Sequence, residues 1–290
     1  MSKRRSRTLL IHAALIFLAA LFVAPVLIVF TNSFMSEFDM VNRYTHVVGP
    51  GNAYQAVGGV NYVRLTFIPD FVSMGQYFKL FFDSPVYLGK FWNSVALALP
   101  VVLGQALICA PAAYAFEMSR HRHKEKAYFV YMVIMLLPLQ VTLVPNFIVA
   151  GWAGLLETRA AVILPAALNP FGVFLMRQYL RGMPTEYIEA AQIDAASHIW
   201  IIFHVVLPIF RPALAALVIL TFINNWNIVE QAIIFLTPKQ EPLSVFLASM
   251  ASQNMGLVFA ASFFYLLPPL LMFLYWKEHM IEGIAMSGLK

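Results

Sequence analysis

Hydrogen-bonding side chains recur at a helical spacing in the last third of the chain. Asn224, Asn227 and Gln231 are three and four residues apart, and Trp226 and Glu230 lie beside them. On a helix this spacing places the three amides on one face. Amides both donate to and accept from ligand hydroxyls, and an indole ring can stack on a sugar face. The same residues could instead hydrogen-bond a neighbouring helix, so a ligand path and a helix–helix contact both remain open.

The chain has no recognisable catalytic or nucleotide-binding motif. It contains no Gly-x-x-x-x-Gly-Lys-Ser/Thr loop to cradle phosphates, and no arrangement of nucleophile, base and orienting acid. His121 and His123 alternate with Arg120, Arg122 and Lys124, whose charges would repel a metal cation. We therefore expect no enzyme activity, no catalytic or metal-binding residues and no cofactor in this chain.

The elements that carry the polar residues are expected to lie in a membrane. Hydrophobic residues make up 61% of the 290 residues and charged residues 11%, which is unlike a soluble domain. Several apolar runs are long enough to cross a bilayer, and backbone groups in lipid must be satisfied within helices. The sequence predicts an all-α membrane protein with six transmembrane helices, at about residues 9–31, 91–117, 127–150, 160–180, 213–236 and 257–276.

The basic residues predict the orientation of these spans. Thirteen of the 19 lysine and arginine residues fall on the side of the N-terminus, which the positive-inside rule assigns to the cytoplasm. Six spans then place the C-terminus in the cytoplasm too. The net charge of +5 is explained by this topology, so we do not expect nucleic acid as a partner. Cys109 stands alone within the second span, which excludes an intramolecular disulfide.

The sequence divides into three parts. Residues 1–34 are a cytoplasmic N-terminus and the first span, residues 35–90 an extracytoplasmic loop, and residues 91–290 a five-span core. The loop is too rich in tyrosine and phenylalanine for a disordered linker. The aromatic residues of this loop could pack on the membrane surface or dock a secreted protein.

Prolines occur within spans three and four of the core. We expect them to kink those helices.

A polar insert interrupts the apolar runs between spans four and five. Thr185 can cap a helix over 186–194, and Ser197 can cap a second short helix. The apolar run 199–203 then lies at the membrane interface, before Pro208 turns the chain into span five. We expect two short cytoplasmic helices at about residues 185–205.

The insert resembles a known signature. Glu189-Ala190-Ala191, Asp194 and Leu207-Pro208 are similar in type and spacing to the "EAA" motif of permease subunits of bacterial ATP-binding-cassette importers. Ala195 departs from the family, which commonly has glycine there, and alanine in a left-handed turn would cost about 1 kcal/mol.

Other segments narrow the resemblance to carbohydrate importers. The tail Glu282–Lys290, the Trp226-Asn227 pair and Pro268 are similar to the maltose-transporter type of sugar permease. The similarity extends from Phe91 onward, about two thirds of the chain, and is weakest in the loop before it.

The resemblance implies a fold and a set of partners. The fold would be that of a type I ABC importer permease in the bacterial cytoplasmic membrane. The partners would be a second related permease, two ATPase subunits that use ATP and Mg, and an extracytoplasmic substrate-binding protein. The loop residues Lys239, Gln240 and Glu241 would reach the binding protein, or the loop would simply close the extracytoplasmic end. The residues coupled to the ATPase would be Glu186, Glu189, Ala190, Ala191, Asp194, Ala195, Leu207 and Pro208.

Two alternatives to a sugar importer stay open. A peptide or amino acid could be the substrate, since Asn, Gln and Trp also bind amides. An ion-coupled secondary transporter could use Glu230 and His12 as proton carriers, although the chain shows no internal repeat of such carriers. Glu230 is the one acidic residue that we expect well inside a span.

Overall fold

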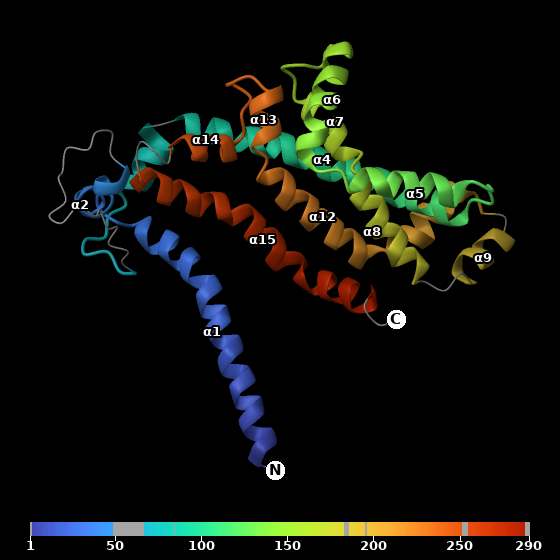
Figure 1. Ribbon diagram of the computed structural model, residues 1–290, viewed down its shortest axis with the longest axis horizontal. Helices are drawn as coiled ribbons and strands as arrows, with labels where there is room; N and C mark the ends of the chain where they lie inside the picture. Colours follow the sequence, from blue (N-terminus) through green and yellow to red (C-terminus); the bar gives the residue numbers. More distant parts are fainter. Residues whose placement is uncertain are drawn as a thin grey trace. The chain divides into compact units, whose positions relative to one another are not determined.

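The computed structural model describes residues 2–48, 67–83, 85–182, 186–194, 196–250 and 255–287. In these ranges the chain is almost entirely helical, and the one β-type pairing is an isolated bridge between Met35 and Val72. The elements follow one another as shown in Figure 1. They are α1 (Ser2–Asn32), α2 (Glu37–Val48), α3 (Gly75–Phe78), the π-helical turn η1 (Lys79–Asp83), α4 (Pro85–Met118), α5 (Lys124–Met135), α6 (Leu139–Trp152), α7 (Ala160–Ala167), α8 (Pro170–Arg181), α9 (Glu186–Ile193), α10 (His198–Ile201), the π-helical turn η2 (Ile202–Val206), α11 (Leu207–Ile209), α12 (Arg211–Trp226), α13 (Glu230–Phe235), α14 (Leu243–Met250) and α15 (Met255–Ser287).

Four stretches of the described residues are long and apolar enough to cross a membrane as they stand. They are Arg7–Asn32, Pro85–Met118, Ala160–Arg181 and Met255–Glu278. Two bent helix pairs pass the same test, and counting each pair as one span gives the predicted six. The pairs are α5 with α6, bent by 103°, and the segment His198–Ile209 with α12, bent by 81°.

The third span differs from its predicted single helix over 127–150. It breaks after Met135, and Pro138 has an extended backbone with ψ of 147° before α6 begins. Proline has no N–H for the helical ladder and disfavours helical geometry in the residue before it. The expected kink is therefore a sharp bend between two separate helices.

The fifth span also differs from its predicted continuous helix over 213–236. α12 ends at Trp226, and Val229 has a non-helical φ of −126° before α13 begins. The Asn227 amide donates to the carbonyl oxygen of Ile223 at 2.9 Å, and the buried Ser244 hydroxyl donates to the carbonyl oxygen of Ile228. The Ile223 carbonyl oxygen also accepts the helical bond from the Asn227 N–H at 3.2 Å, so the Asn227 side chain bonds back onto the last turn, while Ser244 takes the Ile228 carbonyl oxygen that a continuing helix would use. Such side-chain bonds to the backbone compete with the helix and favour its end here.

The described chain forms two compact units, which are described separately. The first comprises Met1–Gly89 with Phe246–Leu267, and the second comprises Lys90–Val245 with Pro268–Lys290. In the first unit, Tyr44 and Met35 are buried against Phe259 of α15. The Asn32 amide at the end of α1 donates to the Tyr44 hydroxyl at 2.6 Å, which ties α1 to α2.

Small residues allow the helices of the second unit to approach closely. A Cβ atom on Gly104 of α4 would lie 2.9 Å from the Cβ atom of Ala167 in α7. A Cβ atom on Gly172 of α8 would collide with the Cys109 sulfur of α4 and lie 3.0 Å from Leu217 of α12. Glycine is thus required where these helices cross, as at many helix contacts in membranes.

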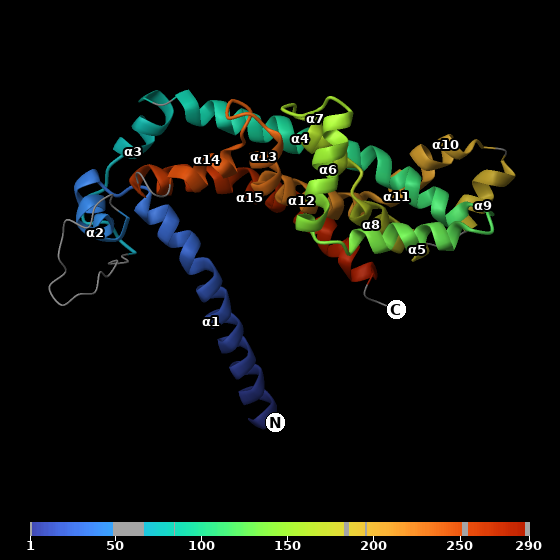
Figure 2. The same cartoon turned by 45° about the horizontal axis from the view of Figure 1, so that its top comes forward.

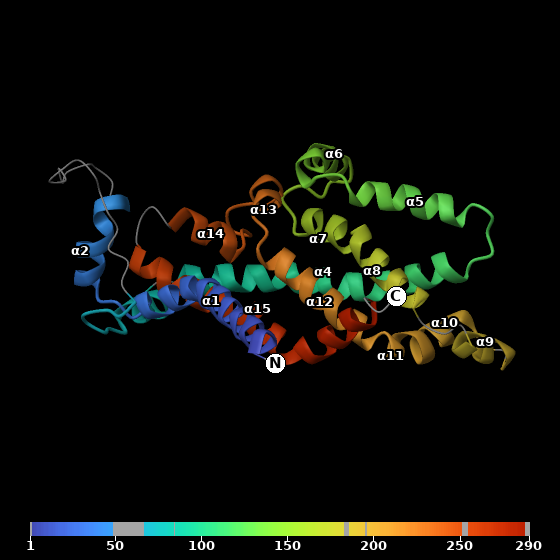
Figure 3. The ribbon, with the colours of Figure 1, turned by 60° about the horizontal axis from the view of Figure 1, so that its bottom comes forward.

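Two regions of the second unit are distinct in the three views. α6, α7 and α13 gather on one side of it, and α9 lies beyond the turn that joins α4 to α5 (Figures 1, 2 and 3). The predicted coupling segment, α9–α11, and the amide-bearing α13 therefore lie in different parts of the unit.

Candidate functional site

The predicted insert forms a chain of short helices between α8 and α12. The Ser197 hydroxyl oxygen accepts a hydrogen bond from the Trp200 N–H at 3.2 Å, which confirms Ser197 as the cap of α10. Thr185 and Ala195 lie outside the described residues. The run that follows Ile201 is a π-helical turn, and α11 contains Leu207 and Pro208.

One apolar side chain anchors α9. Ile188 is 1% exposed and belongs to the same buried cluster as Ile201 and Val206 of the following helices. The α10 helix is held in turn by a 3.0 Å hydrogen bond between the Tyr114 hydroxyl of α4 and the His198 ring. Packing and a hydrogen bond therefore fasten α9 and α10 to α4.

The outer side of α9 is open. The signature residues Glu186, Glu189 and Ala190, together with Asp194 just after the helix, are exposed, and Ala191 is half-buried. Ile193 is 85% exposed, which is unusual for a large apolar side chain outside lipid. A cavity of about 580 Å³ adjoins this surface, and Ala191, Asp194, Ser197 and Trp200 contribute to its lining. The acids, the small residues and the exposed isoleucine of α9 are thus all accessible from outside the chain.

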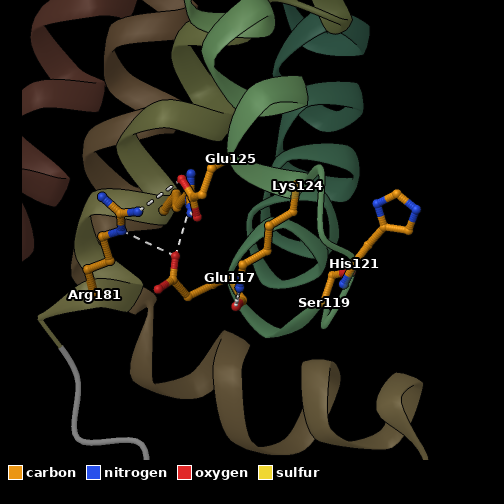
Figure 4. A network of polar contacts seen from close by, with 7 residues as sticks. Glu117, Ser119, His121, Lys124, Glu125 and Arg181 are labelled. Carbon is orange, nitrogen blue, oxygen red and sulfur yellow. Dashed lines mark hydrogen bonds and ion pairs between the residues drawn. The ribbon is translucent and has the colours of Figure 1, made fainter.

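A charged network joins α4, α5 and α8 close to this surface (Figure 4). Arg177 is fully buried, and its Nε and Nη2 donate to Glu117 at 2.8 Å and to Glu125 at 2.6 Å. Its guanidinium carbon lies 3.9 Å from the ring centroid of Tyr128. Arg181, one helical turn further on, reaches Glu117 at 3.2 Å and Glu125 at 3.6 Å.

A cavity of about 760 Å³ opens where the break between α5 and α6 and the break between α12 and α13 meet α7 and α8. The helix breaks at Leu137 and at Asn227–Val229 both contribute to its wall. Unsatisfied backbone groups at such breaks are tolerated in a membrane protein where they face a water-filled cavity. The side chains on the wall include seven amides, so we call it the amide cavity. The seven are Gln140, Asn146, Asn169, Asn224, Asn225, Asn227 and Gln231.

Four of the five residues predicted for a substrate path line this cavity. They are Asn224, Asn227, Glu230 and Gln231. The prediction placed the amides on one face of a single helix. The structure differs, because α12 ends before Asn227 and α13 begins at Glu230. The break and the packing of α13 bring them to the same wall.

Trp226 lies elsewhere. Its side chain is fully buried, stacked on Phe222 with centroids 5.2 Å apart and edge-to-face with Phe91 at 5.6 Å. It does not line the cavity, so the structure does not place it where the predicted stacking on a sugar ring could occur. Its neighbours fill the ring faces that a ligand would need.

The loop predicted to reach a binding protein is fastened to the start of α4. Glu241 pairs with Lys90 at 3.0 Å, and the Asn93 amide donates to the carbonyl oxygens of Lys239 and Glu241 at 2.7 and 3.1 Å. Gln240 is half-buried, whereas the Lys239 side chain is exposed. Of these three residues, Lys239 therefore has the side chain that is most accessible to another protein.

Comparison with known proteins agrees with this architecture. Residues 105–276, which include the coupling segment and all residues of the amide cavity, match the family described as binding-protein-dependent transport system inner membrane component. The chain belongs to this family. It is thus an inner-membrane component of a transport system, as predicted.

Individual members of the family match most of the chain. An arabinooligosaccharide transport system permease protein of Halalkalibacterium halodurans is 26% identical, over 89% of this chain and 92% of its own. A lactose transport system permease protein of Rhizobium radiobacter is 31% identical, over 68% and 74%. A solved bacterial ABC transporter involved in the import of the acidic polysaccharide alginate superposes with a TM-score of 0.80 over 97% of this chain and 98% of that one, at 20% identity. The predicted fold class, the all-helical fold of an ABC importer permease, is confirmed.

The sequence did not predict some residues that the structure places in the amide cavity and in the charged network around Arg177. Gln140 and Asn146 of α6 line the amide cavity, and their signal was two amides in an apolar span next to Pro138. In the sequence, Arg177 is only one of the basic residues that predict the orientation of the spans. Its burial depends on Glu117 and Glu125, which are 60 and 52 residues away and which no local pattern connects to it.

Proposed function

We propose that this chain is one of two related membrane-spanning subunits of an ATP-driven importer for a sugar or oligosaccharide. The family match over the coupling segment and the amide cavity carries the proposal. The relatives support the substrate class, since their names refer to arabinooligosaccharides, lactose and maltodextrin.

The energy source is proposed to be a separate ATPase. The chain has no phosphate-binding loop, so ATP and Mg would be bound by two partner ATPase subunits and this chain would hold no cofactor. The exposed side of α9, with Ile193 at its end, is the surface that would dock on such a partner. The buried Ile188 and the bond between His198 and Tyr114 would pass its movement to α4.

The substrate is proposed to pass along the amide cavity. Asn224, Asn227, Glu230 and Gln231 would form part of the wall, and the partner permease would supply the other half of the path. An extracytoplasmic binding protein would deliver the sugar, with Lys239 among the residues that meet it. The positive-inside distribution supports cytoplasmic N- and C-termini.

The docking surface can be tested by one substitution. An Ile193→Asp variant places a charge where an apolar side chain is to be buried, so we expect at least about tenfold less ATPase to co-purify with the tagged chain. The tagged complex is extracted in mild detergent, and its subunits are quantified by mass spectrometry.

The matched control is Ile68→Asp. Ile68 is a similarly exposed isoleucine, at 78%, in the segment predicted to be extracytoplasmic. It should leave the ratio of ATPase to permease unchanged. Recovery of the unsubstituted chain without a related permease or an ATPase would refute the importer, and equal recovery with Ile193→Asp would refute the docking surface.

A further inference from the structure

The charge of the amide cavity is set by one residue. Among the described residues that line it, Glu230 alone carries a formal charge, and no lysine, arginine or histidine is among them. The remaining polar groups are amides and hydroxyls. The wall therefore combines neutral hydrogen-bonding groups with a single carboxylate.

That carboxylate is held but not neutralised. The Gln140 amide nitrogen across the cavity lies 3.3 and 3.5 Å from the two oxygens of Glu230, which fixes the carboxylate without bringing a positive charge. The Glu230 side chain is exposed, and none of the ion pairs between described residues includes it. Its negative charge therefore acts on whatever enters the cavity.

We propose that Glu230 makes the path selective for uncharged polyhydroxylated ligands and excludes sugars that carry a carboxylate. The inference rests on the proposed function and narrows its substrate class, which the similar proteins leave open between neutral and acidic saccharides.

Both halves of the selectivity follow from the chemistry of the wall. A carboxylate accepts hydrogen bonds from sugar hydroxyls, and the amides beside it donate and accept. A ligand carboxylate instead meets a like charge in a partly enclosed cavity. At a separation of several ångströms such repulsion lowers occupancy by about tenfold.

The sign of the cavity potential can be measured without knowing the substrate. A cysteine reporter at Asn224, on the same wall, is introduced into the assembled complex, and its reaction rates with a cationic and an anionic methanethiosulfonate are compared. Each rate is normalised to that of free cysteine. Cys109 is 1% exposed, so the complex without the reporter serves as the blank.

We expect the normalised rate with the cationic reagent to exceed that with the anionic reagent by about tenfold. Adding Glu230→Gln should bring the ratio close to one, and Glu230→Asp should keep most of it. Glu157→Gln is the matched control, because it removes an exposed carboxylate that does not line the cavity. A ratio near one in the starting complex, or an equal fall with Glu157→Gln, would overturn the proposal.

A transport assay completes the test. The affinities of the binding protein for a neutral trisaccharide and for its C6-oxidised uronate analogue are measured first. Uptake of each sugar into proteoliposomes that contain the complex is then measured in the presence of the binding protein. The ratio of uronate to neutral uptake should rise about tenfold with Glu230→Gln. An unchanged ratio would refute the selectivity. Absence of any sugar uptake in the unsubstituted complex would refute the proposed function instead, while the thiol ratio still reports on Glu230.

Discussion

Arg177 is the most constrained charged residue in the described chain. A fully buried guanidinium is costly unless its charge is balanced, and here two glutamates and the face of Tyr128 surround it. The glutamates come from α4 and α5, so one side chain of α8 holds three helix ends together. Glu117 of the network shares a cavity wall with Ile188 and Glu189 of α9, so the network lies beside the predicted coupling segment.

Removing this guanidinium should destabilise the protein strongly. Arg177→Gln removes two charge-assisted hydrogen bonds and the contact with the Tyr128 ring, so we expect a loss of about 2–3 kcal/mol. Arg181→Gln is the matched control, since Arg181 reaches the same glutamates from a 43% exposed side chain and should cost less than about 1 kcal/mol. The measurement is the temperature at which half of the monodisperse protein is lost in size-exclusion chromatography. Similar losses for both variants would contradict a special role for Arg177.

At the scale of the helices, close packing depends on residues without bulk. Gly172→Ala would force a methyl group against the Cys109 sulfur and should cost about 1–3 kcal/mol. Cys109→Ala in the same chain removes that sulfur, so the double variant should regain part of the loss. Gly89→Ala is the control, because nothing lies within 4 Å of a Cβ atom there. Thermal unfolding of the purified chains in detergent measures all four proteins, and a double variant no better than Gly172→Ala would contradict the assigned collision.

The helices themselves were largely predictable, but their breaks were not. Long apolar runs and capping residues such as Ser197 are local signals, and the structure bears them out. The end of α12 depends on the Asn227 side chain and on Ser244 from a later helix, and no apolar pattern records such a bond. Four of the residues that line the amide cavity were therefore predicted, but on one continuous helix and not across a break. Trp226 is buried between Phe222, one turn earlier on the same helix, and Phe91 of α4, and only the second of these contacts is beyond the reach of a local pattern.

At the scale of the whole molecule, the predicted topology places two exposed turns on opposite sides of the membrane. His123 lies between α4 and α5, and Lys239 lies between α13 and α14. In intact cells, a cysteine that replaces Lys239 should react with a membrane-impermeant maleimide, whereas one that replaces His123 should react only after permeabilisation. Labelling of the His123 position in intact cells would invert the orientation and contradict the cytoplasmic coupling surface.

The bend between α5 and α6 has a consequence for biogenesis. α5 has 12 residues and α6 has 14, which at about 1.5 Å per residue gives helices of roughly 18 and 21 Å. A bilayer core is about 30 Å thick, so neither helix can cross it alone. The wall that covers their break includes Asn224 and Glu230, which the ribosome makes some ninety residues later. We therefore expect the third span to reach its final bent form in the membrane only after the end of the fifth span has been synthesised.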